Sequence, residues 1–363
     1  MKGSAMKKIT SYSLAILASL TTYTSNSANA QQPFYQGKTL SVIVGLAAGG
    51  GTDIMARIFA KALAKNIPGS PSVIVQNMPG AAGVTAMNYM FLRVPKDGLT
   101  VIYDAWTPVE TVVKSPHVRY DYSKMTLIGA LRGGPYMMFA RTDSIPGGIK
   151  NSVDFVKAPS IIYGGQQPSL ILDMHGRLAL DLLRVKYNYI SGYKGAADIR
   201  LAIDRNEINV TTHGMQGYRS GVEPTLVKTG KAVPLWYFQG RDKDGKFISS
   251  ELAGDIPSFQ EVFIKAGGTS SGLQWEALEL LSDLHTSVTN LVWGPPGMDQ
   301  VALNELQKSF TETMNDKEFI SEQTQLYGYA HRNVPVEDAK RIVNTIYGVR
   351  DELSDFMKKF MNP

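Results

Sequence analysis

Residues 39–66 read TLSVIVGLAAGGGTDIMARIFAKALAKN, and this stretch decides the fold. The mostly apolar run 39–44 predicts a buried strand, and the Gly-rich segment 45–51 predicts a turn. A helix follows, because apolar residues recur at helical spacing while Arg57 and Lys61 fall on the opposite face. The apolar face consists of Ile54, Met55, Ile58, Phe59, Ala62 and Leu63. A strand, a tight turn and an amphipathic helix together indicate an α/β sheet.

The same alternation continues downstream. We expect a second strand at 72–75, a second helix at 84–92 and a third strand at 99–103. The strands are mostly apolar on both sides, which is typical of a parallel sheet with helices on both faces. The first part of the chain therefore predicts a mainly parallel sheet flanked by helices.

The pattern then restarts and predicts a second, smaller α/β unit. Further strands are expected at 136–140, 161–163, 187–190, 208–212 and 233–238. Beyond residue 240 the chain is mostly helical, and Pro335 is expected to begin a C-terminal helix. The short apolar run 291–293 predicts a strand that returns to the first sheet. We therefore predict two lobes, each a mainly parallel sheet flanked by helices, formed by 31–138 plus 241–363 and by 139–240.

Residues 1–30 have the pattern of a secretory signal peptide. Three lysines precede an apolar stretch at about 13–20, and the small residues Ala28 and Ala30 frame a cleavage site. The apolar stretch is shorter than the roughly 20 residues that span a bilayer. We expect cleavage near Ala30 and a mature chain that begins near Gln31, with an uncleaved amphipathic start as the alternative.

Charge and cysteine content exclude several classes of protein. The formal net charge is +5, and removal of three lysines with the signal peptide leaves about +2. A net charge this small does not predict binding to nucleic acid or to an anionic membrane. The chain has no cysteine, so an exported protein must be held together by its core without disulfides. No later stretch approaches the length of a transmembrane helix, and we expect no insertion into the membrane.

Two Gly-rich turns lie at the carboxyl ends of predicted strands, where α/β sheets bind their ligands. They read AAGGGTD at 47–53 and NMPGAAG at 77–83. Each precedes a helix, whose first N–H groups are unpaired and suit an anion. The alternative is simple turn geometry. On the first interpretation the candidate ligand-binding residues are Ala48, Gly49, Gly50, Thr52, Asp53, Gly80, Ala81 and Gly83.

No motif for catalysis or for a cofactor accompanies these turns. The phosphate-binding pattern G-x-x-x-x-G-K-[ST] and the G-x-G-x-x-G spacing are both absent. Residues 268–272 read GTSSG, which would make Ser270 the nucleophile of an exported α/β hydrolase, but no buried strand precedes them. The five histidines form no metal-binding cluster. We predict no catalytic residue, no metal and no cofactor, and we retain the hydrolase as the unfavoured alternative.

Six short motifs occur in order along nearly the whole mature chain. They are GGGTD with Ala56 and Arg57, N-x-PGA-x-G at 77–83, P-x-DG-x-T at 95–100, GYKG at 192–195, DIPSFQE at 255–261 and WGPPG at 293–297. In this order the sequence resembles the extracytoplasmic solute receptors of tripartite tricarboxylate transporters, the Bug proteins. The chain departs from the family pattern at Gly45, where proline is common, and at 164–169, where the bulky Gln166 and Gln167 stand in a loop usually rich in Ser and Gly.

The resemblance implies a type II-like periplasmic binding protein that closes around a small organic carboxylate, either a di- or tricarboxylate or an aromatic carboxylate. The loops 48–53 and 80–83 would grip one carboxylate through backbone amides and ordered waters. The receptor would act as a monomer in the periplasm, pass its ligand to the membrane permease and make or break no bond. A receptor for another anionic solute or an amino acid, serving a sensor or another transporter, is the alternative.

Side chains on other loops complete the candidate site, each with a structural alternative. Thr52 and Asp53 either cap their helix or contact the ligand. Trp106 is either a core residue or a wall for a flat ligand. Lys194 is either solvated or opposes a second carboxylate. The remaining candidates, which follow strands of the second lobe, are Gln166, Ser169 and His213.

Overall fold

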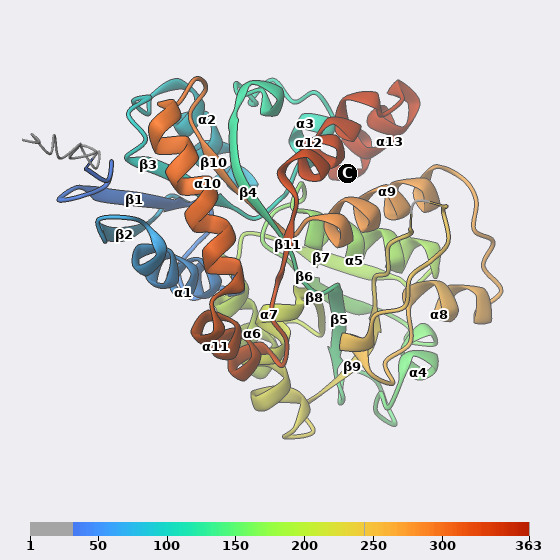
Figure 1. Ribbon diagram of the computed structural model, residues 1–363. Helices are drawn as coiled ribbons and strands as arrows, with labels where there is room; N and C mark the ends of the chain where they lie inside the picture. Colours follow the sequence, from blue (N-terminus) through green and yellow to red (C-terminus); the bar gives the residue numbers. More distant parts are fainter. Residues whose placement is uncertain (1–31, 243, 363) are drawn as a thin grey trace, which may run out of the picture. The chain divides into compact units, whose positions relative to one another are not determined.

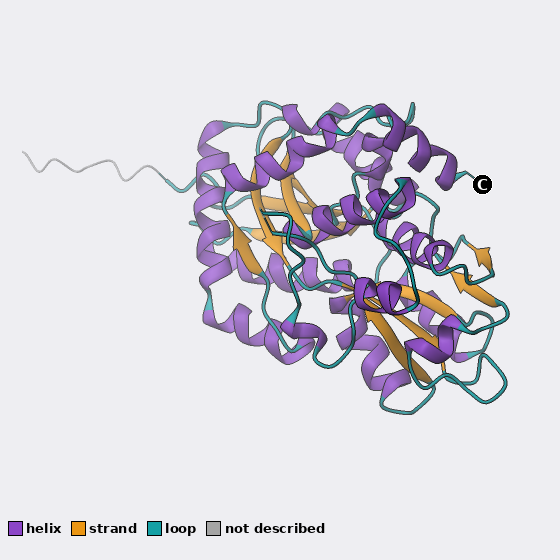
Figure 2. Cartoon of the chain, turned by 90° about the vertical axis from the view of Figure 1, so that its right-hand side faces the viewer, coloured by secondary structure: helices purple, strands orange, loops and turns teal. Residues whose placement is uncertain are grey.

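The computed structural model describes residues 32–242 and 244–362, so the predicted signal peptide lies outside the described residues. Residues Pro33–Pro363 form one compact unit. Two separate sheets lie in this unit, each with helices packed against it, as Figure 2 shows. The predicted two-sheet α/β fold is confirmed, while the exact lobe boundaries stay a prediction.

The first sheet contains six strands in the order β11-β4-β10-β3-β1-β2. Strands β1 to β4 run in one direction, whereas β10 and β11 run against them. The predicted strands at 39–44, 72–75, 99–103 and 291–293 are present. The strands, visible in Figure 1, are β1 (Thr39–Val44), β2 (Ser72–Asn77), β3 (Thr100–Asp104), β4 (Thr126–Arg132), β10 (Asn290–Gly294) and β11 (Arg332–Val334).

The second sheet repeats this arrangement with the strand order β7-β6-β8-β5-β9. Strands β6 to β9 share one direction, and β5 runs antiparallel between β8 and β9. The strands are β5 (Tyr136–Arg141), β6 (Ile161–Gly164), β7 (Tyr187–Ile190), β8 (Val210–Gly214) and β9 (Ala232–Tyr237). Each sheet therefore places an antiparallel strand next to its third parallel strand, the first sheet has a second antiparallel strand, β11, at its edge, and both sheets remain mainly parallel.

The chain passes between the sheets twice, as the sequence predicts. It leaves the first sheet after β4 through Gly133, Gly134 and Pro135 and enters the second sheet at Tyr136. It leaves the second sheet after β9 and re-enters the first at β10. A fold with two crossing segments allows the sheets to move relative to each other as a hinge.

Two hydrophobic clusters cover the sheets. One includes apolar residues of α1, α10, α6 and the π-helical segment η3, and the other includes those of α2, α12, α5 and α9. These helices are α1 (Gly51–Asn66), α2 (Val84–Leu92), α5 (Ile171–Leu182), α6 (Ala196–Asp204), η3 (Tyr218–Val227), α9 (Leu273–Ser287), α10 (Gln300–Asn315) and α12 (Val336–Asn344). The others are α3 (Val109–Val112), α4 (Ser152–Val156), α7 (Met215–Gly217), α8 (Phe259–Lys265), α11 (Lys317–Tyr327) and α13 (Asp351–Met361). Among the described residues, no helix is both long and apolar enough to cross a membrane.

The C-terminal helix differs from the prediction. Pro335 does precede a helix, α12, but the chain then forms a short 3-10 turn at Thr345–Gly348 before α13 begins. The apolar spacing continues across this break, because α12 and α13 both pack on the same core cluster. Periodicity alone therefore predicts one helix where the chain forms two.

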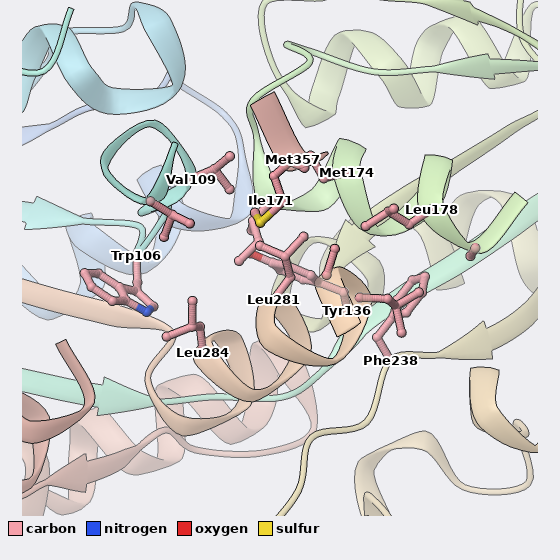
Figure 3. Packing of buried hydrophobic residues seen from close by; sticks show 14 of the residues in the cluster. Trp106, Val109, Tyr136, Ile171, Met174, Leu178, Phe238, Leu281, Leu284 and Met357 are labelled. Carbon is pink, nitrogen blue, oxygen red and sulfur yellow. The ribbon is translucent and has the colours of Figure 1, made fainter. Parts of the chain in front are cut away.

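Trp106 belongs to the core. Its side chain is fully buried, and its ring meets that of Tyr122 edge-on at a centroid distance of 5.1 Å. Figure 3 shows Trp106 and Leu284 to one side of the core residues around Tyr136 and Leu281. Of the two roles considered for Trp106, the structure shows the packing role.

Gly98 tests the packing of α10 on the first sheet. Its φ is +77°, and a Cβ at this position would lie 2.3 Å from Cβ of Ala302. Gly98→Ala is expected to lower the free energy of unfolding by about 1–2 kcal/mol through backbone strain and by a further ~1–3 kcal/mol through overpacking. Gly37→Ala is the control, because its φ is +69° with no atom nearby. Urea unfolding should show the larger loss for Gly98→Ala, and equal losses would contradict this packing.

Candidate ligand-binding site

A cavity of about 70 Å³ lies between loops of the two sheets. From the first sheet it is lined by residues at the start of α1 and at the ends of strands, among them Gly50, Thr52, Asp53, Thr107 and Asn290. From the second sheet it is lined by Gln166, Leu170, Gly195, Ala196, His213 and Gln216. A space of this size suits a small solute, and both sheets contribute to its walls.

Three helices of eight residues or more begin at the cavity. The N-cap residues of α1, α5 and α6 are Gly50, Leu170 and Gly195, and all three line the cavity. None of the three helices has a side-chain cap. Gly214, which precedes α7, also lines the cavity and has no side-chain cap. The first N–H groups of a helix without such a cap remain available to a ligand.

Several helices elsewhere in the described chain have side-chain caps. Asn151, Ser258, Asp299 and Asp316 each accept a hydrogen bond from a backbone N–H in the first turn of their helix. Glycine and leucine cannot do so at the cavity. The helix starts at the cavity thus combine partial positive charge with unpaired donors, which favours an anion.

No lysine or arginine lines the cavity, and its one ionised side chain is already paired. The Asp53 carboxylate forms an ion pair with Arg57 at 2.9 Å, and it accepts hydrogen bonds from the Gly49 N–H and the Asn77 amide, each at 2.9 Å. Burial raises the pKa of Asp53, but these hydrogen bonds outweigh burial and hold the pKa below its usual value. Asp53 therefore fixes the turn before α1.

The second Gly-rich loop lies behind the cavity wall. Thr107 lines the cavity and donates a hydrogen bond of 2.8 Å to the carbonyl oxygen of Ala82. The loop has positive φ at Gly80, Ala81, Ala82 and Gly83, and it supports Thr107 from behind. Its residues do not themselves line the cavity.

Five of the thirteen candidates line the cavity, and eight do not. The lining residues are Gly50, Thr52, Asp53, Gln166 and His213. The other eight are Ala48, Gly49, Gly80, Ala81, Gly83, Trp106, Ser169 and Lys194. Lys194 is exposed, although its neighbour Gly195 is a lining residue, and Ser169 is buried beside Leu170.

Tyr136, an aromatic candidate for contact with the ligand, lines the cavity after the first crossing. The lining residues His285 and Asn290 lay outside the prediction, because α9 and β10 return to the site late in the chain. The His285 ring stacks on Tyr136 at a centroid distance of 3.4 Å, and its Nε2 lies 3.1 Å from the Gly134 carbonyl oxygen. No local motif marks these residues, and only the return of β10 to the first sheet could have indicated them.

The buried histidines of the cavity are neutral. Burial, and then the charge of Arg200, lowers the pKa of His213 to about 3. Burial, and then the nearby His175, lowers the pKa of His285 to about 3. The cavity therefore presents neutral polar groups and backbone N–H donors.

Ser270 is exposed in the loop before α9, and none of the described residues forms a hydrogen bond with its hydroxyl group. No group of three or more His, Asp or Glu side chains in residues 32–242 and 244–362 could hold a metal ion. A hydrolase would need a base beside its nucleophile.

No family model matches the chain. A curated relative, the UPF0065 protein in the TAR-I ttuE-ttuC' intergenic region of Agrobacterium vitis, is 28% identical over 171 residues. The match covers 45% of this chain and 47% of the relative, so the chain spans about half the length of that relative.

Solved structures of periplasmic binding proteins share the fold. The binding protein BugD covers 90% of this chain and 98% of its own, with 18% identity and a TM-score of 0.69. MatC from Rhodopseudomonas palustris with bound malate covers 90% and 99%, with 17% identity and a TM-score of 0.65. Another R. palustris protein, with adipate, covers 90% and 97%, with 18% identity and a TM-score of 0.66. The periplasmic-binding-protein fold implied by the sequence resemblance is thereby confirmed.

Asp104, at the end of β3 beside the lining residue Ala105, makes stability depend on pH. It is buried, its Oδ2 has no partner among the described residues, and burial raises its pKa to about 7 from 3.8. The folded protein thus holds a proton that the unfolded chain has lost, so this contribution to stability is present below about pH 4 and is lost as pH rises to about 7.

At pH 8 the free energy of unfolding of Asp104→Asn should therefore exceed that of the wild type, by up to about 1.4 kcal/mol for each unit of difference between the folded and unfolded pKa of Asp104. The gain should shrink towards pH 4. Chemical denaturation at both pH values measures it, with the exposed Asp355→Asn as control. A gain that is independent of pH would contradict the assignment.

Proposed function

We propose that the protein is a periplasmic solute-binding receptor of the Bug type that encloses a small organic carboxylate and delivers it to the permease of a tripartite tricarboxylate transporter. The observation that carries the proposal is the convergence of uncapped helix N-termini from both sheets on a cavity without lysine or arginine. Malate and adipate, bound to two proteins of the same fold, are ligands of this class.

The two sheets are expected to close on the ligand, because each sheet supplies backbone N–H donors to the cavity. The start of α1 belongs to the first sheet, whereas the starts of α6 and α7 belong to the second. A carboxylate that accepts hydrogen bonds from both sides stabilises the closed arrangement relative to an open one. Gly133 and Gly134 lie in the first crossing segment and are closely packed, because a Cβ would come within 2.7 Å of the His331 ring at Gly133 and of the Met215 side chain at Gly134. Closure gives the permease a surface that only the loaded receptor has.

The ligand class is tested with mature protein that begins at Gln31. Thermal unfolding is followed with mono-, di- and tricarboxylates and with sulfonates, phosphate esters and amino acids. We expect at least one carboxylate to raise Tm by several degrees, since ligand at 100 times Kd adds about 2.7 kcal/mol. A shift with a sulfonate, phosphate ester or amino acid alone would overturn the carboxylate proposal and favour the alternative receptor.

The transport role is tested separately. Deletion of a permease encoded beside this receptor should abolish uptake of the radiolabelled ligand while the purified receptor still binds it. Normal uptake without that permease would favour service to a sensor or to another transporter. Analytical ultracentrifugation with and without ligand checks the expected monomer.

Gly51 tests whether the close approach of α1 to α7 is needed for ligand binding. A Cβ at Gly51 would lie 3.0 Å from the Gly217 backbone nitrogen, whereas a Cβ at Gly50 would lie 3.8 Å from its nearest neighbour, the Ala47 carbonyl oxygen. Gly51→Ala should therefore hold α1 away from α7 and weaken ligand binding about ten-fold or more. Gly348→Ala is the control, because it is exposed, has no atom within 4 Å of an added Cβ, and lies outside the cavity lining, and it should bind as the wild type does. Calorimetry measures both, and equal affinities would contradict closure at this contact.

A further inference from the structure

We propose that the ligand is a hydroxycarboxylate, whose carboxylate meets the helix N-termini and whose hydroxyl group donates to acceptor side chains of the cavity lining. The inference rests on the proposed function and adds the chemistry of the ligand's second end. It depends on buried side chains of the cavity that have a fixed hydrogen-bonding character and no partner in the described protein.

Asn290 supplies the first acceptor. It is the first residue of β10, is 2% exposed and lines the cavity. Its Nδ2 lies 3.4 Å from the Asp104 carbonyl oxygen, which can only accept a hydrogen bond. The side-chain oxygen Oδ1 has no partner among the described residues. Because the amide nitrogen is committed to a carbonyl, the atom left unpaired is an acceptor.

His285 supplies the second acceptor. It is 5% exposed, lines the cavity and places Nε2 at 3.1 Å from the Gly134 carbonyl oxygen. Since a carbonyl oxygen only accepts, Nε2 carries the hydrogen of the neutral ring. Nδ1 is then a lone-pair acceptor, and it has no partner in the described part of the chain.

His213 adds a group that can act in both ways. It is 2% exposed and lines the cavity from β8, and neither ring nitrogen has a partner among the described residues. A neutral imidazole has one donor and one acceptor nitrogen. A hydroxyl group, which also donates and accepts, is complementary to it.

The lining of the cavity therefore has two chemical parts. The starts of α1 and α6 offer backbone N–H donors, whereas Asn290 and His285 offer acceptors. A second ionised carboxylate would bring acceptor oxygens against acceptors. A ligand without a donor would leave buried acceptors unpaired, which weakens binding by roughly ten-fold or more for each.

A hydroxyl group suits this wall better than an ammonium group. A buried ammonium requires an unpaired anionic partner. The Asp53 carboxylate, the one acid that lines the cavity, already binds Arg57, Gly49 and Asn77. Asp104 is buried next to Asn290, and burial favours the neutral form of its carboxyl group.

The test compares acids that share a carbon skeleton. Isothermal titration of the mature protein is carried out with succinate, both malates and the tartrates, with butyrate and 3-hydroxybutyrate, and with the hydroxylated and plain forms of any other skeleton that raises Tm in the carboxylate panel. We expect the best hydroxylated acid to bind at least ten-fold more tightly than its plain counterpart.

Two outcomes would overturn the inference and leave the receptor proposal intact. One is equal or tighter binding of the plain acid, and the other is tighter binding of the amino acid of the same skeleton, such as aspartate against malate. If no carboxylate of any kind binds, the receptor proposal itself fails and the inference fails with it.

Asn290→Leu tests the acceptor, because it keeps the approximate volume and removes Oδ1. It also removes the Nδ2 hydrogen bond to the Asp104 carbonyl oxygen, so the two acids are compared on the same variant. The ratio of its affinities for the hydroxylated and the plain acid should be at least five-fold lower than the same ratio for the wild type, whereas its affinity for the plain acid should change little. A purely structural role would weaken both acids equally and would contradict the assignment. Asn304→Leu, at an exposed position on α10, is the control. If Asn290→Leu does not fold, the comparison of acids on the wild type still decides the inference.

Discussion

The proposed site depends on backbone N–H groups that are free to bind an anion. This requires helices that begin without a side-chain cap, and Gly50 and Gly195 meet the requirement at the starts of α1 and α6. It also requires a rigid turn, which Asp53 provides through its bonds to Arg57, Gly49 and Asn77. A buried lysine or arginine would carry a desolvation cost when the site is empty, and neutral donors reduce that cost.

The arrangement of the two sheets brings these helix starts together. In each sheet the first three parallel strands follow the same order, and an antiparallel strand lies beside the third of them. Parallel strands with connecting helices place helix N-termini at the carboxyl ends of the strands. Two sheets that face each other at those ends thus supply donors from opposite sides. The crossings at 133–135 and before β10 join the sheets and contribute Tyr136 and Asn290 to the walls.

Local sequence patterns predicted the strands of the second sheet, the strands β1, β2, β3 and β10 of the first, and the turn at 47–53, because the apolar runs and the turn are marked by neighbouring residues in the chain. The sequence analysis did not predict strands β4 and β11 or the lining residues His285 and Asn290. All of them depend on contacts between residues more than 150 positions apart in the chain. The loop at 80–83 has the right composition for an anion site, yet it lies behind Thr107. Sequence spacing does not determine which of two similar turns faces the cavity.

The most direct measurement is a crystal structure of the mature protein with the acid that binds best in the carboxylate panel. We expect carboxylate oxygens within hydrogen-bonding distance of backbone N–H groups at the start of α1 on one side and of α6 on the other, in a closed arrangement. A carboxylate bound instead to a lysine or arginine side chain outside the cavity, with the helix N-termini hydrated, would contradict this mode of binding.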